Sequence, residues 1–348
     1  MNRRKFLKSG ILATATVGSG LSMLQCSGRK SMPKSKRELI LSLINEDKPQ
    51  EYFPAGFFIH FGEGYKSGEA AIQKHLEYFR FTNMDFMKIQ YEKTFPKIAG
   101  IQKPSDWASM PLHKKDFYEE PLAVIKGIVK EAKKEAPVIA TFYSPFACAG
   151  HTTSDEIITR HLEEDPELTR KGLEIITESL LIYIKECIKL GVDGFLQSTQ
   201  GGEGGRFTEA SLFTEYVKPF DLIAGREMEA GCSSNILHIC DHSGNYDDYS
   251  AFVDYPGHII NCSLDLTNDQ TISSREMYQL FNKPFMGGMH KRGIMSSGTQ
   301  EEISSEVSRV LSQAPEKFVL AASCTLPGDI DWANINTAID TAHQYQSG

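Results

Sequence analysis

The chain alternates short apolar segments with amphipathic ones from residue 56 almost to its end. The short segments are bounded by Gly, Pro or polar residues, which is typical of buried strands, whereas the longer ones have helical spacing. Strands are predicted at residues 56–61, 86–91, 137–143, 192–197, 235–241, 258–264, 284–289 and 318–324. Helices are predicted at residues 68–81, 121–132, 166–190, 208–230, 271–281, 300–312 and 331–345. This alternation predicts an α/β protein with a single (β/α)8 TIM barrel over residues 38–348.

A doubly wound open sheet is the alternative fold for the same alternation. It is disfavoured because no Gly-x-Gly-x-x-Gly motif follows the first predicted strand. The length of 348 residues and the hydrophobic content of 41% suit one large domain. Pro219 is expected to bend or split the helix predicted at 208–230.

The first 26 residues are predicted to be a targeting segment outside the fold. Residues 2–8 resemble a twin-arginine export signal, and the apolar stretch at 10–24 is shorter than the roughly 20 residues that span a membrane. Cys26 follows this stretch as a candidate lipidation site, and residues 27–37 form a polar linker. The segment predicts an exported protein, periplasmic or lipid-anchored at the outer surface, and a cytoplasmic one if the signal is not used.

The charge and the cysteines exclude two classes of protein. The formal net charge is −8 and no basic block follows the N-terminal segment, so a nucleic-acid partner is not expected. The seven cysteines are scattered without paired spacing, which does not indicate a disulfide framework.

The strand predicted at 235–241 carries the most specific chemical signal. It ends in His238-Ile239-Cys240-Asp241-His242. Residues two apart in a strand point to the same face, so His238 and Cys240 project side by side. An imidazole and a thiol in this arrangement are half of a zinc site. The alternative is a buried histidine beside a small apolar cysteine.

A barrel supplies a third ligand, because its active site lies at the carboxyl ends of the strands. Cys324 closes the last predicted strand, three steps around the ring from the strand of His238 and Cys240. These three side chains would hold one zinc ion with one open position, the pattern of a catalytic site. Such a centre binds a substrate thiol and keeps it as a nucleophilic thiolate. Cys262 is the rival thiol ligand, but a buried bystander is the favoured interpretation.

Other polar residues at the predicted strand ends are candidates for catalysis and substrate binding. Asp241 and His242 are predicted to orient His238 or to transfer protons, and Tyr143 to act in the pocket. The predicted substrate-binding residues are His60, Gln200 and His290.

The sequence resembles the uroporphyrinogen decarboxylase superfamily over nearly all of residues 38–346. The resemblance lies in FMGGM at 285–289, GTQEEI at 298–303, Glu306-Val307, FVLAASC at 318–324, Pro327, Asn334, Ser144-Pro145-Phe146 and Asp193-Gly194. It implies a (β/α)8 barrel. One branch of this superfamily, similar to methylcobamide:coenzyme M methyltransferase, uses a His-x-Cys…Cys zinc site that His238, Cys240 and Cys324 match residue by residue. This branch implies zinc, a small thiol acceptor and a corrinoid protein as the methyl donor.

Three functions remain open at this point. The favoured one is a zinc-dependent methyl or alkyl transfer to a thiol, although an exported protein has no obvious corrinoid partner. The second is a porphyrinogen decarboxylase. The resemblance implies that such an enzyme binds the substrate carboxylates through arginines that follow the first strand. Residues 58–65 contain no arginine. The third is an exported protein that binds corrinoids or tetrapyrroles without catalysis.

Overall fold

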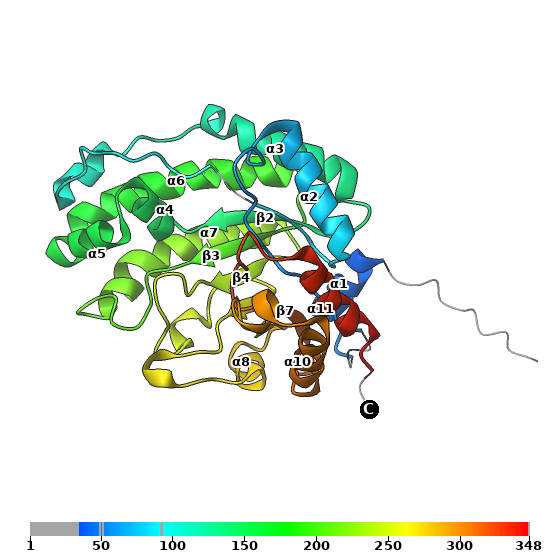
Figure 1. Ribbon diagram of the computed structural model, residues 1–348. Coiled ribbons are helices and arrows are strands. Elements are labelled where there is room, and N and C mark those ends of the chain that lie inside the picture. The colour runs from blue at the N-terminus through cyan, green and yellow to red at the C-terminus, as the bar shows by residue number, and fades with distance from the viewer. Residues whose placement is uncertain (1–34, 49, 51, 91–92, 347–348) are drawn as a thin grey trace, which may run out of the picture. The chain divides into compact units, whose positions relative to one another are not determined.

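Seven parallel strands form one curled sheet, hydrogen-bonded in chain order from β1 to β7 (Figure 1). The computed structural model describes residues 35–48, 50, 52–90 and 93–346. The strands are β1 (Met87–Ile89), β2 (Val138–Tyr143), β3 (Gly194–Thr199), β4 (Ile236–Ile239), β5 (Ile259–Cys262), β6 (Phe285–Met289) and β7 (Phe318–Ala322). The parallel α/β architecture, with a sheet of barrel type, is therefore confirmed.

The strand predicted at 56–61 is not formed as a regular strand, and this prediction was wrong. Within the described residues, this segment makes only isolated bridges, from Ala55 to Leu320 and from Ile59 to Leu326. Pro54 contributes a carbonyl but has no N–H to donate, which interrupts a regular ladder. The Ala55 carbonyl also accepts a hydrogen bond from the Asp85 N–H, just before β1. A closed ring of eight strands stays a prediction.

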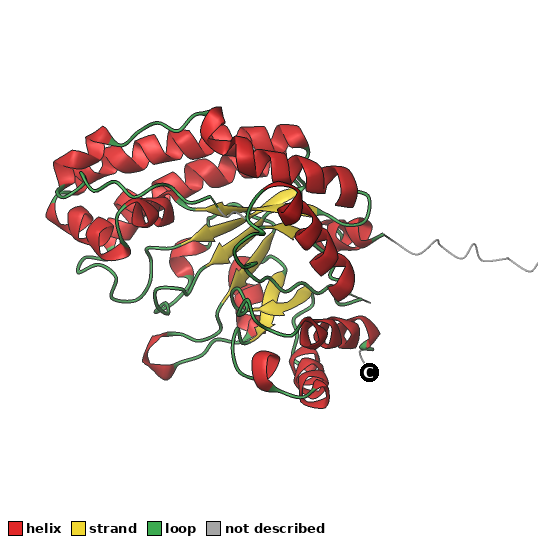
Figure 2. Ribbon diagram, turned by 45° about the horizontal axis from the view of Figure 1, so that its top comes forward, coloured by secondary structure: helices red, strands yellow, loops and turns green. Residues whose placement is uncertain are grey.

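All seven predicted helices have a counterpart in the structure, and helices cover the outer face of the sheet (Figure 2). The helices that correspond to predicted ones are α2 (Gly68–Thr82), α3 (Glu119–Ala132), α6 (Pro166–Leu190), α7 (Lys218–Gly231), α8 (Ser274–Phe281), α10 (Gln300–Ser312) and α11 (Trp332–Gln344). The single helix predicted at 208–230 is split as expected, because Pro219 lies in the first turn of α7, after the π-helical turn η3 (Phe213–Val217). None of the helices in the described ranges is long and apolar enough to cross a bilayer.

Several helices were not predicted. They are α1 (Lys36–Asn45), α4 (Pro145–Thr152), α5 (Asp155–Glu164), α9 (Ile294–Ser297) and the 3-10 turns η1 (Pro104–Ser109), η2 (Lys115–Tyr118), η4 (Ser250–Phe252) and η5 (Thr267–Asp269). Ser144 and Pro145 indicated only the end of a strand, yet the Ser144 side chain caps α4 and Pro145 occupies its first turn. The linker predicted at 27–37 is wrong at its end, because a capping box between Ser35 and Glu38 starts α1.

The interior of the curled sheet has two layers. The lower layer, near the amino ends of the strands, is apolar and contains Phe58, Phe86, Ile139, Leu196, Ile236, Ile259, Met286, Val319 and Ala321. Ile40 and Leu43 of α1 belong to the same cluster, so α1 closes this end of the sheet. Arg37 holds α1 there, since its guanidinium binds both carboxylate oxygens of Asp193.

The upper layer of the interior is polar. Side chains two residues apart in a strand point to the same face. The residue two positions after each apolar one therefore also points inward, but lies closer to the carboxyl end of its strand. Those positions are Lys88 after Phe86, Thr141 after Ile139, Ser198 after Leu196, His238 after Ile236 and Asn261 after Ile259. The change from apolar to polar along each strand places the candidate site at the carboxyl end.

Candidate metal centre

His238, Cys240 and Cys324 come together at the carboxyl ends of β4 and β7. His238 lies in β4, Cys240 directly follows β4, and Cys324 lies two residues beyond β7. The sheet order places β5 and β6 between these strands, so the predicted separation of three steps is confirmed. Cys324 Sγ lies 3.5 Å from His238 Nε2 and 4.0 Å from Cys240 Sγ, and all three ligand atoms lie within 4.8 Å of one another.

These spacings fit a single tetrahedral zinc ion. Bond lengths of about 2.3 Å to sulfur and 2.0–2.1 Å to nitrogen place two thiolates about 3.8 Å apart, and a thiolate about 3.6 Å from an imidazole nitrogen. The observed separations of 4.0 Å and 3.5 Å match both values. The other ring nitrogen of His238, Nδ1, is buried without a hydrogen-bond partner among the described residues. The donor set therefore suits one ion with an open fourth position.

The three side chains also shift one another's pKa. The hydrogen bond with Cys240 and the nearby His238 imidazole lower the pKa of Cys324 against the effect of burial. The same hydrogen bond, followed by burial, raises the pKa of Cys240. Burial works against a charged His238, yet the Cys324 thiolate raises the pKa of the imidazole above its ordinary value. Cys324 is therefore the more acidic of the two thiols and Cys240 the less acidic one, and metal binding displaces the protons that the three donors still hold.

Three neighbours hold the end of β4 in place. Gln200, at the carboxyl end of β3, directs its side-chain Nε2 toward Cys240 Sγ at 3.9 Å. Asp241 is buried and forms an ion pair with Lys291, whose Nζ lies 2.6 Å from Asp241 Oδ1. The Tyr246 hydroxyl donates to the Cys240 carbonyl at 2.9 Å. These contacts fix the backbone and the sulfur that flank the metal position.

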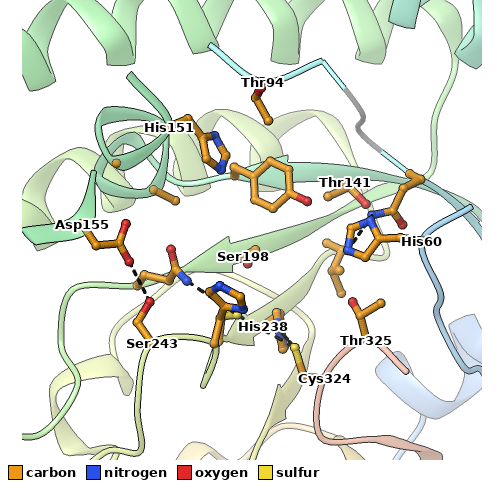
Figure 3. A pocket seen from close by; sticks show the side chains of 18 of the residues that line it. His60, Thr94, Thr141, His151, Asp155, Ser198, His238, Ser243, Cys324 and Thr325 are labelled. Atoms are coloured by element: carbon orange, nitrogen blue, oxygen red, sulfur yellow. Dashed lines mark hydrogen bonds between the residues drawn. The ribbon is translucent and has the colours of Figure 1, made fainter. Parts of the chain in front are cut away.

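The three donors line a cavity of about 1140 Å³ (Figure 3). Figure 3 shows His238 beside Cys324, and His60 and Thr141 along another part of the wall. The polar upper layer of the sheet interior supplies much of that wall, through Lys88, Gln90, Thr141, Tyr143, Ser198 and Gln200. The cavity is therefore large enough to hold a small thiol and a second, bulkier reactant together.

Four of the six other predicted catalytic and substrate-binding residues line this cavity, whereas Asp241 and His290 do not. His60, Tyr143, Gln200 and His242 line it, and His60 Nδ1 lies 2.6 Å from Gln90 Nε2. His290 does not line the cavity, because its exposed ring turns toward Asp265 Oδ2 at 3.7 Å. The prediction that His290 binds substrate has no support from this placement.

The two remaining cysteine predictions have different outcomes. Cys262 packs in the outer core between sheet and helices, and burial raises its pKa, so it is a bystander as favoured. Cys26 lies outside the described residues.

Several cavity residues, among them Lys88, Lys97 and Arg206, were missed from the sequence. The cationic side chains in the wall are Lys88, Lys97, Arg206, Lys291 and Arg292. The cavity wall therefore carries cationic side chains, although residues 58–65 contribute no arginine or lysine to it. Two of these charges are already paired, since Arg206 Nε lies 2.8 Å from Glu203 Oε2 and Lys291 binds Asp241. The inward alternation in β1 was the signal that would have identified Lys88.

His151 is a further cavity residue that the sequence gave no reason to select. It lies on α4, a helix that was not predicted, and its ring packs edge-on against Tyr143 at 5.1 Å. Burial lowers the pKa of His151, which favours a neutral imidazole at this wall. Ser243 and Asp155 form a hydrogen bond of 2.7 Å at the rim nearby (Figure 3).

Comparison with known proteins identifies the family of this chain. The family model for uroporphyrinogen decarboxylase (URO-D) matches residues 86–345. A uroporphyrinogen decarboxylase from Aquifex aeolicus (strain VF5) is 24% identical over 268 residues, which cover 74% of this chain and 74% of that protein.

Solved structures share the fold at low sequence identity. A methyltransferase from Methanosarcina mazei has a TM-score of 0.69 at 13% identity, covering 89% of this chain and 98% of that one. A putative vitamin-B12-independent methionine synthase from Listeria monocytogenes has a TM-score of 0.56 at 11% identity, covering 87% and 100%. The family model matches most of the chain, which therefore belongs to the uroporphyrinogen decarboxylase family.

Proposed function

We propose that this protein is a zinc-dependent methyl or alkyl transferase that activates a thiol acceptor. The observation that carries the proposal is the convergence of His238, Cys240 and Cys324 on one cavity wall, with separations that fit a single tetrahedral ion. Three protein ligands with an open position are typical of catalytic rather than structural zinc. The fold likeness to a methyltransferase and to a putative methionine synthase is in keeping with this proposal.

His238 Nε2 and the sulfur atoms of Cys240 and Cys324 would hold the zinc. Bound zinc would supply Lewis acidity at its open position, which keeps an acceptor thiol in its thiolate form near neutral pH. Gln200 supports the Cys240 sulfur, and the ion pair between Asp241 and Lys291 fixes the residue that follows it. These contacts hold the donor set ready before substrate arrives.

The cavity wall also offers groups that can remove the proton of the acceptor thiol. His242 lines the cavity and has an exposed ring, so it can pass a proton from the cavity to solvent. Tyr143 stands at the carboxyl end of β2 and faces the same space. We assign His242 and Tyr143 to this step. The proposed methyl donor is a corrinoid carried by a partner protein.

The test has two parts and uses the full chain. Metal analysis of protein purified from zinc-supplemented cells should give about one zinc per chain, and Cys324→Ala should give almost none. The zinc form should then methylate a small thiol, with methylcobalamin as the methyl donor. Mass spectrometry detects the thioether product. A wild-type protein without zinc, or a Cys324→Ala variant that retains it, would contradict the proposal.

A second candidate is decarboxylation of a porphyrinogen. The family match and the Aquifex relative favour it, and five cationic side chains line the cavity. Pairing of Arg206 with Glu203 and of Lys291 with Asp241 reduces the charge left for substrate carboxylates. Incubation with uroporphyrinogen, followed by chromatography of the oxidised porphyrins, distinguishes the two. Products with fewer carboxyl groups would support decarboxylation.

Export remains a separate proposal. The twin-arginine-like residues 2–8 and the candidate lipid site at Cys26 lie outside the described residues. Fractionation of cells that express the full chain, with Arg3→Lys and Arg4→Lys together as the control, tests it. Membrane association that depends on Cys26 would support a lipid anchor, and a wild-type protein confined to the cytoplasm would contradict export.

A further inference from the structure

We propose that Cys240 and Cys324 form a reversible disulfide with each other when no metal is bound. The reagent is a small-molecule disulfide such as oxidised glutathione. The pairing stands on the geometry of the two side chains, and its regulatory meaning rests on the proposed zinc site. Oxidation would remove two of the three donors at once, so the redox state of this pair would decide whether the site can take up metal.

The two sulfur atoms are already close enough to pair. Cys240 Sγ and Cys324 Sγ lie 4.0 Å apart. A disulfide needs about 2.05 Å, so side-chain rotation has to close a gap of about 2 Å. Both residues lie beyond the ends of their strands, where the ladder does not restrain the backbone on both sides. The Cys240 backbone is held by Thr199 and Tyr246. Adjustment therefore falls on side-chain torsions and on the Cys324 segment.

The surroundings give the two cysteines different parts in the reaction. Cys324 is partly exposed and lines the cavity, so it meets a reagent that enters from solvent. Cys240 also lines the cavity but is buried, so it serves as the resolving thiol. The other described cysteines, Cys148, Cys187, Cys232 and Cys262, are buried away from the cavity wall. A disulfide reagent in the cavity therefore meets Cys324 first.

The exchange proceeds in two balanced steps. Cys324 attacks one sulfur of the reagent disulfide, the reagent's S–S bond breaks, and one reagent thiolate leaves. Cys240 then attacks Cys324 Sγ in the mixed disulfide, the Cys240–Cys324 bond forms, and the second reagent thiolate leaves. The two cysteine protons end on the two released thiols. The protein pair loses two electrons, and the reagent disulfide gains them.

The experiment counts thiols in the full chain. Metal-free protein incubated with oxidised glutathione should lose two free thiols per chain, and peptide mapping should show a peptide from around Cys240 linked to one from around Cys324. Dithiothreitol should restore both thiols. Saturating zinc, added first, should slow the loss at least about tenfold, because both sulfur atoms are then coordinated.

Matched variants separate the steps. Cys240→Ser should stop at a stable glutathione adduct on Cys324. Cys324→Ser, which keeps only the Cys240 thiol of the pair, should lose no thiol. Cys262→Ala removes a buried cysteine outside the cavity and should still form the linked peptide. Circular dichroism of each variant checks that it is folded.

The outcomes for the pair and for the proposed function are distinguishable. Wild-type metal-free protein that keeps both thiols, or that links a different pair, overturns the inference. A pair that forms equally fast with and without zinc supports the disulfide but contradicts the proposed metal site.

Discussion

The lower and upper layers of the sheet interior are built from the same strands but have opposite chemistry. In β4, Ile236 is fully buried in the apolar layer, and His238, two residues later, is a buried metal-ligand candidate. In β3, Leu196 is followed in the same way by Ser198 and Gln200. Two residues span about 7 Å along a strand. The interior therefore changes from apolar side chains that stabilise the fold to polar side chains of the candidate site within that distance.

The comparison shows that the upper layer is maintained at an energetic cost. Each fully buried aliphatic side chain of the lower layer contributes about 1.5–3 kcal/mol. The upper layer holds buried polar atoms with no hydrogen-bond partner in the described structure, among them Thr141 Oγ1, His238 Nδ1 and Ser323 Oγ. Each such atom costs about 1–3 kcal/mol. A bound ligand or metal would offset part of this cost, which favours a functional reason for the polar layer.

The largest expected effect is the loss of metal from the upper layer. Cys324→Ala should lower zinc affinity by at least about 100-fold, because it removes one of only three protein ligands. Competition with a chromophoric chelator measures the affinity. The unfolding free energy of the metal-free variant should stay within about 2 kcal/mol of metal-free wild type, because Cys324 is small and partly exposed. A variant that unfolds instead would show that this layer carries stability as well.

The complementary experiment substitutes a residue of the apolar lower layer. Ile236→Ala should destabilise the protein by about 2–5 kcal/mol, since it opens a cavity in a fully buried apolar cluster. Urea unfolding measures the loss. The folded variant should still bind about one zinc per chain, and a loss of zinc in folded protein would mean that the two layers cannot be separated along β4.

A buried carboxyl group outside the cavity offers a further test of the separation between stability and metal binding. Asp221 on α7 receives hydrogen bonds from Thr199 and Tyr255, and burial raises its pKa to about 7. The folded protein therefore keeps this proton at pH values where the unfolded chain has lost it, so stability falls as the pH rises from about 4 to 7 and levels off above.

Asp221→Asn removes this titration. The stability of the variant relative to wild type should rise by up to about 4 kcal/mol between pH 4 and pH 8. Urea unfolding of both proteins across this range measures the difference, while zinc binding by the variant should be unchanged. A difference that is flat with pH would mean that the carboxyl group is ionised throughout.

The smallest expected effect concerns the support of one ligand. Gln200→Leu should lower zinc affinity about tenfold, because the amide no longer positions Cys240 Sγ. Gln197→Leu is the matched control, because Gln197 lies in β3, which Gln200 directly follows, but turns outward, toward the backbone of Asp221. Its zinc affinity should equal that of wild type. Equal losses in both variants would point to a general disturbance of β3.

The sequence alone determined the alternation of elements and the identity of the three donor residues. Apolar periodicity is local, so it located seven strands and the larger helices, and the spacing of two between His238 and Cys240 fixed their common face. It failed at 56–61 because regular pairing there depends on partners far along the chain. It failed at α1 because the sequence does not reveal that Ile40 and Leu43 close the apolar layer.

Tertiary structure alone decided which polar residues share the cavity. No local sequence pattern links Lys88 in β1, His151 in α4 and Arg206 in the segment after β3. The curl of the sheet also decided the 4.0 Å separation of Cys240 and Cys324. Contacts between residues 84 positions apart are set by how strands pack around a common axis, and no sequence spacing encodes that distance.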